Sequence, residues 1–594
     1  MTRLREFFAL AFLIGTALSL HAAQDGEARA PIPAERLAEW SPGTHTGVPG
    51  GIPDNRNVLI DVTKAPYNAD PTGQADAQPA IQKAINEAKP NEVVYLPAGT
   101  YRVNKGVGCF GGKSHITIRG AGPEKTIMLG YQPAGSIIGI APADGGDWWY
   151  PQRAKLEIAG SPARGATVLT VGETKVLDGY PNGGIGQICQ LALKNDPKLP
   201  VVVPANFDYQ RKHLTRIVAK TETTVTIEPG LLFDLPAELA PVLRPVGRYS
   251  EGVGIEDLAV DGANSPAPHG LIGVGQSYGC WVKNVAVRNG ERYLFGMDGS
   301  LRCEIRGCFI AGRKTAAGPN GGGLLFTMSG SCLIEDNVIS PGTEVDGGCT
   351  GNVFAYNFCD DAAIQGNLLC ASINTNHGAH NSFNLYEGNL APRFQCDGYH
   401  GSASHDTAFR NWFHGSSAKT DQYWICVTLN RFTRCYSLVG NVLGRKGHEW
   451  NYEVGMSGFA YEKHYIYSLG FPNMGNGWCN GKTAQPSLGQ FWPDWEKMLA
   501  AAPGKGPGPG GFQELDLDVP ATTLRKGNYN CKDLGVPASE ALDGAALPAS
   551  LYRKEKPEWF GDLAWPAFGP DTDFEKHKIP AQARFEARQA SAGR

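Results

Sequence analysis

A repeat between residues 250 and 445 constrains the fold more than any other feature of this sequence. Short apolar units recur there, and their equivalent positions are Leu258, Val285, Cys308, Asn337, Asn357, Asn389, Asn411 and Asn441. Successive positions are separated by 27, 23, 29, 20, 32, 22 and 30 residues. Each interval suits one coil of a solenoid whose short strands are joined by loops of unequal length. The repeat predicts an all-β chain folded as a right-handed parallel β-helix.

The residue types at these positions indicate how neighbouring coils contact one another. Asparagine occupies five successive positions, tolerates the left-handed backbone of a turn, and can bond through its amide to the next coil. Cys280, Cys303 and Cys332 each precede a marker by five residues, so we expect them to stack. Fourteen cysteines in an exported chain would permit disulfides. Buried thiols that fill the core are the favoured alternative.

Residues 55–104 predict the N-terminal end of the solenoid. A strand over residues 57–62 is followed by a turn at residues 70–73 and a short helix from Asp76 to Ala88. A buried strand at residues 93–96 comes next. A helix laid across the end of a solenoid shields the exposed core and the unpaired strand edge. We therefore expect this helix to cap the first coil.

Two motifs in this segment resemble the N-terminus of the rhamnogalacturonase/epimerase-like pectate lyase family. They are Pro79-Ala80-Ile81-Gln82-Lys83-Ala84-Ile85 and Leu96-Pro97-Ala98-Gly99-Thr100-Tyr101. The family's acidic turn is reduced here to Asp70-Pro71-Thr72-Gly73, and Asp76 alone remains of its double aspartate. The resemblance covers roughly 50 residues and implies a secreted parallel β-helix that acts on polysaccharide.

Composition and patterning divide the chain into five parts. Residues 1–23 have the basic start, apolar centre and small residues of a signal peptide, which predicts a secreted protein, extracellular or periplasmic. The rest is predicted as an N-terminal cap with the first coils (24–151), an antiparallel β insertion (152–247), coils with the active site (248–450), and the last coils with an extended C-terminal strap (451–594). A net charge of −4 argues against nucleic acid as a partner. We expect no membrane span, and a monomer.

Polar residues suited to catalysis concentrate between residues 377 and 414. β-Elimination of a uronate-containing glycan needs a base for the proton beside the carboxylate and a cation that neutralises it. The predicted catalytic residues are His400, His405, Arg410, His380, Glu387 and Asp397. The predicted substrate-binding residues are Asn384, Arg393, His377, Asp406, Trp412 and Trp424, the last two as sugar-stacking platforms. We therefore expect a lyase that acts on an acidic polysaccharide bound along the β-helix.

Other readings of the same residues stay open. Glycoside hydrolysis needs two carboxyl groups, which Glu387 with Asp397 or Asp406 could supply. If calcium assists elimination, the same three carboxylates are the nearest hard oxygen ligands. A sugar C5-epimerase would share proton abstraction with a lyase, and His377, His380 and His400 could alternatively hold a transition metal. A non-catalytic glycan-binding surface protein is the alternative from another class.

Overall fold

The fold is seen in a computed structural model of the chain. It describes residues 31–110, 112–133, 135–141, 154–199, 209, 211–266, 270–291, 293–312, 322–359, 373–397, 402–415, 425–454, 464–471 and 516–592. The predicted signal peptide therefore lies outside the described residues. No helix in the described ranges is long and apolar enough to cross a membrane.

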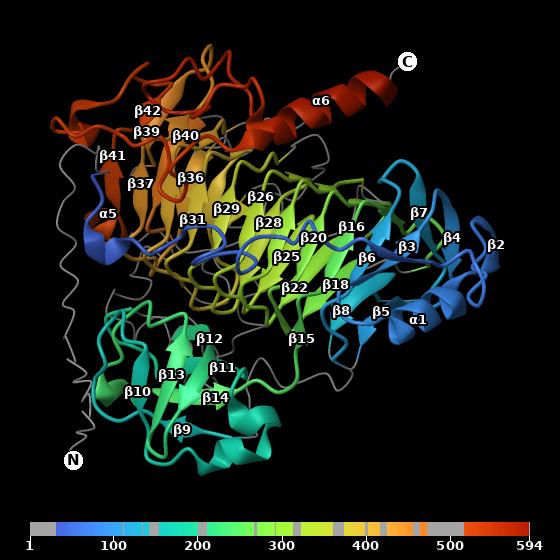
Figure 1. Cartoon of the computed structure of the whole chain (residues 1–594). Helices are drawn as coiled ribbons and strands as arrows, with labels where there is room; N and C mark the ends of the chain where they lie inside the picture. The colour runs from blue at the N-terminus through green and yellow to red at the C-terminus, as the bar shows by residue number, and fades with distance from the viewer. Residues whose placement is uncertain are drawn as a thin grey trace, which may run out of the picture.

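Three long parallel sheets form the sides of the β-helix (Figure 1). Sheet I has twelve strands: β1 (Val58–Asp61), β3 (Glu92–Leu96), β6 (Thr117–Gly120), β16 (Gly254–Glu256), β20 (Trp281–Lys283), β23 (Glu304–Arg306), β26 (Leu333–Glu335), β29 (Val353–Ala355), β31 (Leu385–Glu387), β34 (Thr407–Phe409), β37 (Ser437–Val439) and β41 (Leu524–Lys526). Sheet II begins with β2 (Thr72–Asp76), β4 (Gly99–Val103), β7 (Thr126–Gly130), β17 (Ala259–Asp261), β21 (Ala286–Arg288), β24 (Phe309–Ile310) and β27 (Val338–Ile339). Bridges at Phe358 continue it into β32 (Leu390–Ala391), β35 (Trp412–Phe413), β38 (Val442–Leu443) and β42 (Tyr529–Asn530).

Sheet III has eleven strands and runs the length of the solenoid. They are β5 (Val107–Phe110), β8 (Ile138–Ala141), β18 (Ile272–Gly275), β22 (Phe295–Asp298), β25 (Leu324–Thr327), β28 (Thr343–Asp346), β30 (Ile373–Asn374), β33 (Phe394–Cys396), β36 (Ile425–Leu429), β40 (His464–Leu469) and β39 (Trp450–Glu453). A short pair, β15 (Ser250–Glu251) and β19 (Ser277–Tyr278), lies beside the main sheets. The predicted fold class is confirmed.

The register of sheet I confirms the predicted repeat. Its strands pair in the order Gly254, Trp281, Glu304, Leu333, Val353, Leu385, Thr407 and Ser437. The separations of these partners equal the seven intervals between the repeated positions in the sequence. Each unit of the repeat is therefore one coil.

Asparagine side chains form the predicted ladder inside the coils. Asn389 donates from Nδ2 to Oδ1 of Asn411 at 2.9 Å, and Asn411 donates in the same way to Asn441. Each acceptor oxygen also receives a backbone N–H, such as that of Asn389 on Asn411. Asn528 extends the ladder by one coil. Buried amides satisfied in this way fix the contact between neighbouring coils.

The stacked cysteines are buried thiols, the alternative that the sequence analysis favoured over disulfides. Cys280, Cys303 and Cys332 are buried and free, and Sγ of Cys332 accepts the backbone N–H of Cys303 at 3.3 Å. In later coils the same position is taken by Asn352, Asn384 and Asp406, which form a second buried polar ladder.

Two further parts complete the architecture (Figure 1). The capping helix α1 (Gln78–Glu87) buries Ile81, Ala84 and Ile85 at the N-terminal end of the solenoid. A six-stranded antiparallel sheet forms the insertion, in the order β10 (Val168–Thr170), β13 (Thr224–Glu228), β12 (Arg211–Lys220), β11 (Ile188–Leu193), β14 (Val242–Pro245) and β9 (Leu156–Glu157). The insertion contacts the β-helix where Leu214 lies against Gly330 and Leu232 against Gly351.

Terminal segments cover the outer face of sheet I. Residues 31–56 run along it, where Trp40 donates to the carbonyl of Phe383 and Arg302 donates to the carbonyl of Gly47. Residues 547–579, here called the C-terminal strap, pack Tyr552, Phe560 and Phe568 into the same apolar layer. The short helix α5 (Asp518–Thr522) and strand β42 precede the strap in the chain. Helix α6 (Pro580–Ala592) follows it.

Candidate active site on sheet III

The outer face of sheet III carries a cluster of carboxylates over its central strands. In β28, Val345 points into the core and is fully buried. Because side chains alternate along a strand, Glu344 and Asp346 point outward from the same strand. Glu344 is 6% exposed, and its Oε1 accepts a hydrogen bond from Oη of Tyr293 at 2.5 Å.

Asp397 joins this cluster from the end of β33. Its Oδ2 accepts from Nδ2 of Asn374 at 2.6 Å and lies 3.0 Å from Nδ1 of His377. Asn376 donates to the backbone carbonyl of Asp397 at 3.0 Å. His377 is placed beside β28 because its backbone N–H bonds to the carbonyl of Val345. Two predicted residues, His377 and Asp397, thus meet in one ion pair.

The environment separates the protonation states of these groups. Burial disfavours the charged form of His377, but Asp397, Glu344 and Asp346 outweigh it and raise the pKa of the imidazole to about 10. His377 is therefore a cation at neutral pH. Burial raises the pKa of Asp346 to about 6, with Glu344 and Asp397 adding to the shift and His377 opposing it. Pairs of titratable groups whose pKa values are pushed apart are typical of acid–base sites.

The insertion contributes a lysine to the edge of this cluster. Lys212 of β12 is buried and packs against Gly348, two residues after Asp346. Burial lowers the pKa of its ammonium to about 7, and Asp346 opposes that shift. A residue more than 100 positions away in the sequence thus lies beside the carboxylates of β28.

Three predicted site residues lie instead beneath the C-terminal strap. Glu387 is fully buried, accepts from Oη of Tyr356 at 3.0 Å and from the backbone N–H of Leu551 at 2.8 Å. Arg410 forms a two-bond ion pair with Asp571 at 2.7 and 2.8 Å. Trp412 packs against Phe568 and Phe574. Their contacts fasten the strap to sheets I and II.

Two more of the predicted site residues, Asn384 and Asp406, belong to the polar ladder inside the coils. Asn384 donates to Asp406 at 3.1 Å, and Asp406 also accepts from Oη of Tyr436. Burial raises the pKa of Asp406 to about 8. The structure therefore does not bring together Glu387, Asp397 and Asp406, the set considered for calcium. Within the described ranges, no group of three or more His, Cys, Asp or Glu side chains could hold a metal ion.

The remaining predicted residues lie elsewhere or outside the described ranges. His380 and His405 both contact Oγ of Ser404, each at 2.8 Å, on the turn that faces the insertion. Arg393 is buried just before β33. His400 and Trp424 lie outside the described residues.

Sequence reasoning missed Tyr293, Glu344, Asp346 and Lys212. One signal was present for two of them: Thr343-Glu344-Val345-Asp346 alternates polar and apolar residues, which places both carboxylates on the outer face of a half-buried strand. Nothing local marks Lys212 or Tyr293, because their proximity to β28 depends on the packing of the insertion and of a coil two turns earlier.

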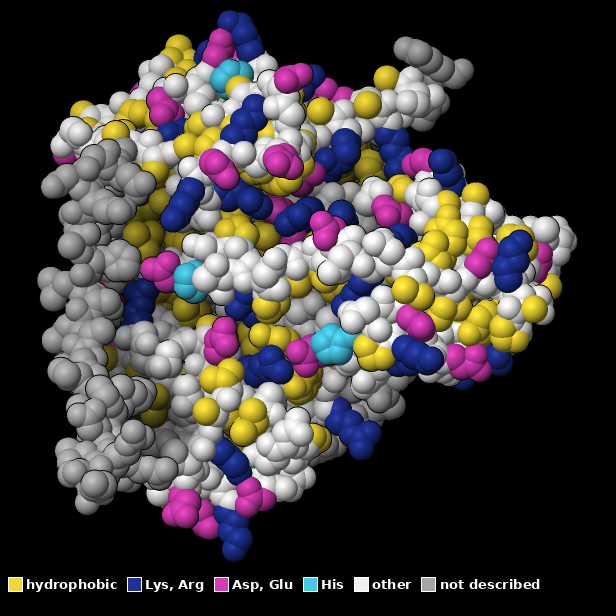
Figure 2. Space-filling model, in the orientation of Figure 1, with side chains coloured by type: hydrophobic (Ala, Val, Ile, Leu, Met, Phe, Trp, Pro, Cys, Tyr) yellow, Lys and Arg dark blue, Asp and Glu magenta, His cyan; other side chains and the backbone are white. Residues whose placement is uncertain are grey.

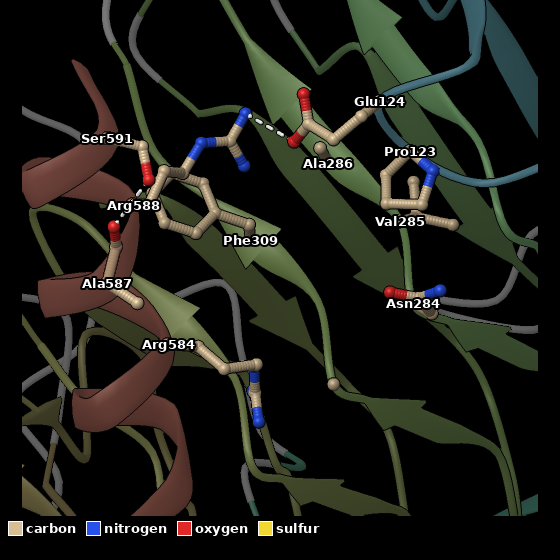
Figure 3. Close-up of a pocket in the computed structure, with 11 residues that line it drawn as sticks. Pro123, Glu124, Asn284, Val285, Ala286, Phe309, Arg584, Ala587, Arg588 and Ser591 are labelled. Atoms are coloured by element: carbon tan, nitrogen blue, oxygen red, sulfur yellow. Dashed lines mark hydrogen bonds and ion pairs between the residues drawn. The ribbon is translucent and has the colours of Figure 1, made fainter. Parts of the chain in front are cut away.

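A separate hollow lies between α6 and the outer face of sheet II (Figure 3). Its volume is about 670 Å³, and Phe309 lies on its wall beneath the guanidinium of Arg588, 4.3 Å from the ring centre. Arg588 also pairs with Glu124 at 3.0 Å, and Arg584 with Asp336 at 2.7 Å. These ion pairs join α6 to the coils. The hollow therefore lies at the interface between the C-terminal helix and the β-helix.

Comparisons with known proteins found one family model that matches part of the chain and several solved structures of low sequence identity. Residues 60–144 match the family described as rhamnogalacturonase A/epimerase, pectate lyase-like. No curated protein sequence matches the chain. Among solved structures, the tailspike gp61 of Pseudomonas phage phi297 is 14% identical, with 69% of this chain and 67% of that chain covered and a TM-score of 0.49. The A-module of the Azotobacter vinelandii mannuronan C-5 epimerase AlgE4 is 14% identical, with coverage of 69% and 95% and a TM-score of 0.33.

The catalytic unit of a GH87 α-1,3-glucanase from Streptomyces thermodiastaticus is also similar. It is 11% identical, with 72% of this chain and 69% of that chain covered and a TM-score of 0.27.

Proposed function

We propose that this chain is a polysaccharide-active enzyme whose active site is the carboxylate cluster on sheet III. The parallel β-helix fold and the match of residues 60–144 to the pectate lyase-like family support the proposal. The reaction that the geometry favours is hydrolysis of a glycosidic bond. The observation that carries this proposal is the pair of unlike carboxyl groups: Asp346, with a pKa raised to about 6, and Asp397, held by the His377 cation. Glycoside hydrolysis requires one protonated and one ionised carboxyl group.

Each residue of the cluster has a role in this reaction. Asp346 supplies the proton to the leaving oxygen, since a carboxyl group with a raised pKa keeps its proton closer to neutral pH. Asp397 is the ionised partner that activates water or stabilises the positive charge on the sugar. Asn374 and His377 hold Asp397 in place and keep it charged. The Tyr293 hydroxyl fixes Glu344 beside them.

The charge of the cluster is the reason to rank hydrolysis above elimination. Glu344, Asp346 and Asp397 face one imidazolium and one lysine whose pKa is near 7, so an anionic sugar at the scission point meets net negative charge. Elimination on a uronate requires a cation there instead. Lys212 is the specific observation in favour of a lyase, because an amine with its pKa lowered to about 7 can act as a general base.

The face of the molecule drawn in Figure 2 shows no dominant charge among the described residues. Figure 2 shows basic and acidic side chains interspersed over one face of the molecule, consistent with a net charge of −4. Export through the segment at residues 1–23 is part of the proposal, since that segment has the pattern of a signal peptide.

The test is product analysis on a panel of neutral and uronate-containing polysaccharides. We expect new reducing ends without the ultraviolet absorbance of an unsaturated product, and a loss of at least about 100-fold for Asp346→Asn. Ultraviolet absorbance abolished by Lys212→Met would identify a lyase instead. Binding of a glycan that is never cleaved, unaffected by Asp346→Asn, would contradict the enzyme proposal and leave a glycan-binding protein.

A further inference from the structure

Three arginines meet at the junction of the N-terminal segment, the insertion and the late coils. Arg36 donates to the carbonyl of Tyr436 at 3.2 Å, and Arg164 donates to the carbonyls of Glu35 and Leu37. Arg211 lies over the ring of Phe233, 4.0 Å from its centre. Among the described residues, none of the three forms an ion pair with a carboxylate. We call Arg36, Arg164, Arg211 and the adjacent His405 the cationic junction.

Other partly buried arginines of this protein are neutralised directly. Arg119 pairs with Glu256 at 2.7 Å, Arg434 with Asp516 at 2.8 Å and Arg553 with Glu335 at 2.6 Å. A cation withdrawn from water without a partner costs free energy, so proteins seldom leave one. Asp234 acts on Arg164 and Arg211 electrostatically, but no carboxylate of the described residues forms an ion pair with either guanidinium. Three guanidinium groups in one place without a directly bound carboxylate therefore require an explanation.

Arg211 has the largest unused capacity for hydrogen bonds. Its Nε is enclosed and has no partner in the part of the chain that the structure describes. Its terminal nitrogens are not enclosed in the same way, and no hydrogen bond occupies them among the described residues. Stacking on Phe233 holds the guanidinium plane in a fixed orientation. A planar fork that is fixed in this way matches a carboxylate or another oxyanion.

His405 lies among the three arginines. Its ring stacks on Phe383 with 4.9 Å between ring centres, and Arg164 lies 5.0 Å from the centre of the same ring. Burial, followed by the charges of Arg211, Arg36 and Arg164, lowers the pKa of His405 to about 3. The imidazole is therefore neutral at pH 7. Its Nδ1 contacts Oγ of Ser404, which leaves Nε2 available for a ligand.

We propose that the cationic junction is a binding site for an oxyanion carried by a saccharide, a carboxylate or a sulfate group. The site is separate from the carboxylate cluster of sheet III, but both lie along strand β12. Arg211 faces the junction, and the next residue, Lys212, packs beside Asp346. Because neighbouring side chains of a strand point to opposite faces, one strand carries a residue of each site. A glycan that is cleaved at a neutral linkage and bears an acidic group further along would occupy both.

The experiment measures binding of small anions to the full chain by titration calorimetry. Sodium glucuronate, sodium sulfate and uncharged glucose are the three probes, and the variants are Arg211→Gln and Arg211→Lys. Arg216→Gln is the matched control, because Arg216 lies on the same strand and pairs with Glu251 at 3.5 Å. We expect one or both anions to bind, glucose not to bind, and Arg211→Gln to weaken binding at least about tenfold.

The outcomes separate the two sources of the anion and decide the proposal. Glucuronate binding alone identifies a carboxylate, and sulfate binding alone identifies a sulfated sugar. Partial retention of affinity in Arg211→Lys, with Arg216→Gln unchanged, supports a charge-specific site. Failure of both anions to bind, or equal weakening by Arg211→Gln and Arg216→Gln, would overturn the proposal. Because no catalysis is measured, the result is independent of whether Asp346 proves to be catalytic.

Discussion

The outer faces of sheets I and III both carry charged residues, but they use them differently. On sheet I, Glu335 is fully buried and is bound by Arg306 at 3.0 Å and by Arg553 of the C-terminal strap at 2.6 Å. On sheet III, Asp346 has no ion pair with a described residue, and Asp397 is bound by His377, a side chain 25% exposed. Charges on sheet I fasten chain segments, whereas those on sheet III keep unlike protonation states within reach of solvent.

The difference shows that polar residues close together in the sequence need not share one face of the β-helix. Glu387 and Asp397 are ten residues apart and were both candidates from the sequence. Glu387 lies under the strap because it ends β31 of sheet I, whereas Asp397 lies in the sheet III cluster because it follows β33. The predictions below test this division between fastening and catalytic charges.

The largest expected effect separates two carboxylates of the same segment. Asp397→Asn removes the ionised partner of His377 and should lower kcat/KM at least about 100-fold. Glu387→Gln keeps the hydrogen bond from Leu551 and should leave kcat/KM within a few-fold of the parent protein. Initial rates of reducing-end release measure both. Equal losses in the two variants, with unchanged melting temperatures, would contradict the division.

Removal of a fastening charge should reduce stability rather than activity. Arg553→Met leaves the buried Glu335 with one of its two arginine partners, and we expect the free energy of unfolding to fall by about 3 kcal/mol. Denaturant unfolding measures it. Lys578→Met breaks the exposed pair with Glu586 and is the control, with an expected change below about 1 kcal/mol. If Arg553→Met lost activity while its stability stayed unchanged, the prediction would be contradicted, and sheet I would have a catalytic function.

The core carboxyl group Asp406 should make stability depend on pH. Its pKa rises from 3.8 to about 8 in the folded protein, so between these values the native state binds a proton that the unfolded state has lost. The contribution of Asp406 to stability is therefore lost as pH rises from about 4 to 8, with a slope of up to about 1.4 kcal/mol per pH unit.

The variant Asp406→Asn tests whether Asp406 causes this pH dependence. Asparagine suits this ladder position, as Asn384 shows one coil earlier, and it has no proton to lose. Melting temperatures recorded from pH 5 to 8 should fall less in the variant than in the parent protein, and activity should persist. A parallel pH dependence in both proteins would show that Asp406 is not the titrating group.

The smallest expected effect concerns the asparagine ladder. Asn411→Ala leaves Asn389 without its acceptor and should cost about 1–3 kcal/mol of unfolding free energy. Asn104→Ala, at an exposed position where the side chain accepts from Arg102, should change it by less than about 0.5 kcal/mol. Equal effects would indicate that the ladder follows coil stacking without stabilising it.

The sequence by itself determined the coils. The spacing of the repeat reproduces the strand register of sheet I, the asparagines and cysteines stack where the pattern placed them, and the helix at residues 78–87 caps the first coil. These features can be predicted because they depend on local alternation of residue types and on the number of residues per coil, both of which are properties of the sequence.

Tertiary structure decided which outward side chains form a site. Alternation shows that Glu344, Asp346 and Glu387 point out of the coil, but it does not show what covers them. The strap that buries Glu387 comes from residues more than 160 positions later, and the lysine beside Asp346 comes from an insertion more than 130 positions earlier. Burial and charge at each carboxylate, and with them its pKa and chemistry, depend on those distant segments and therefore could not be read from local sequence.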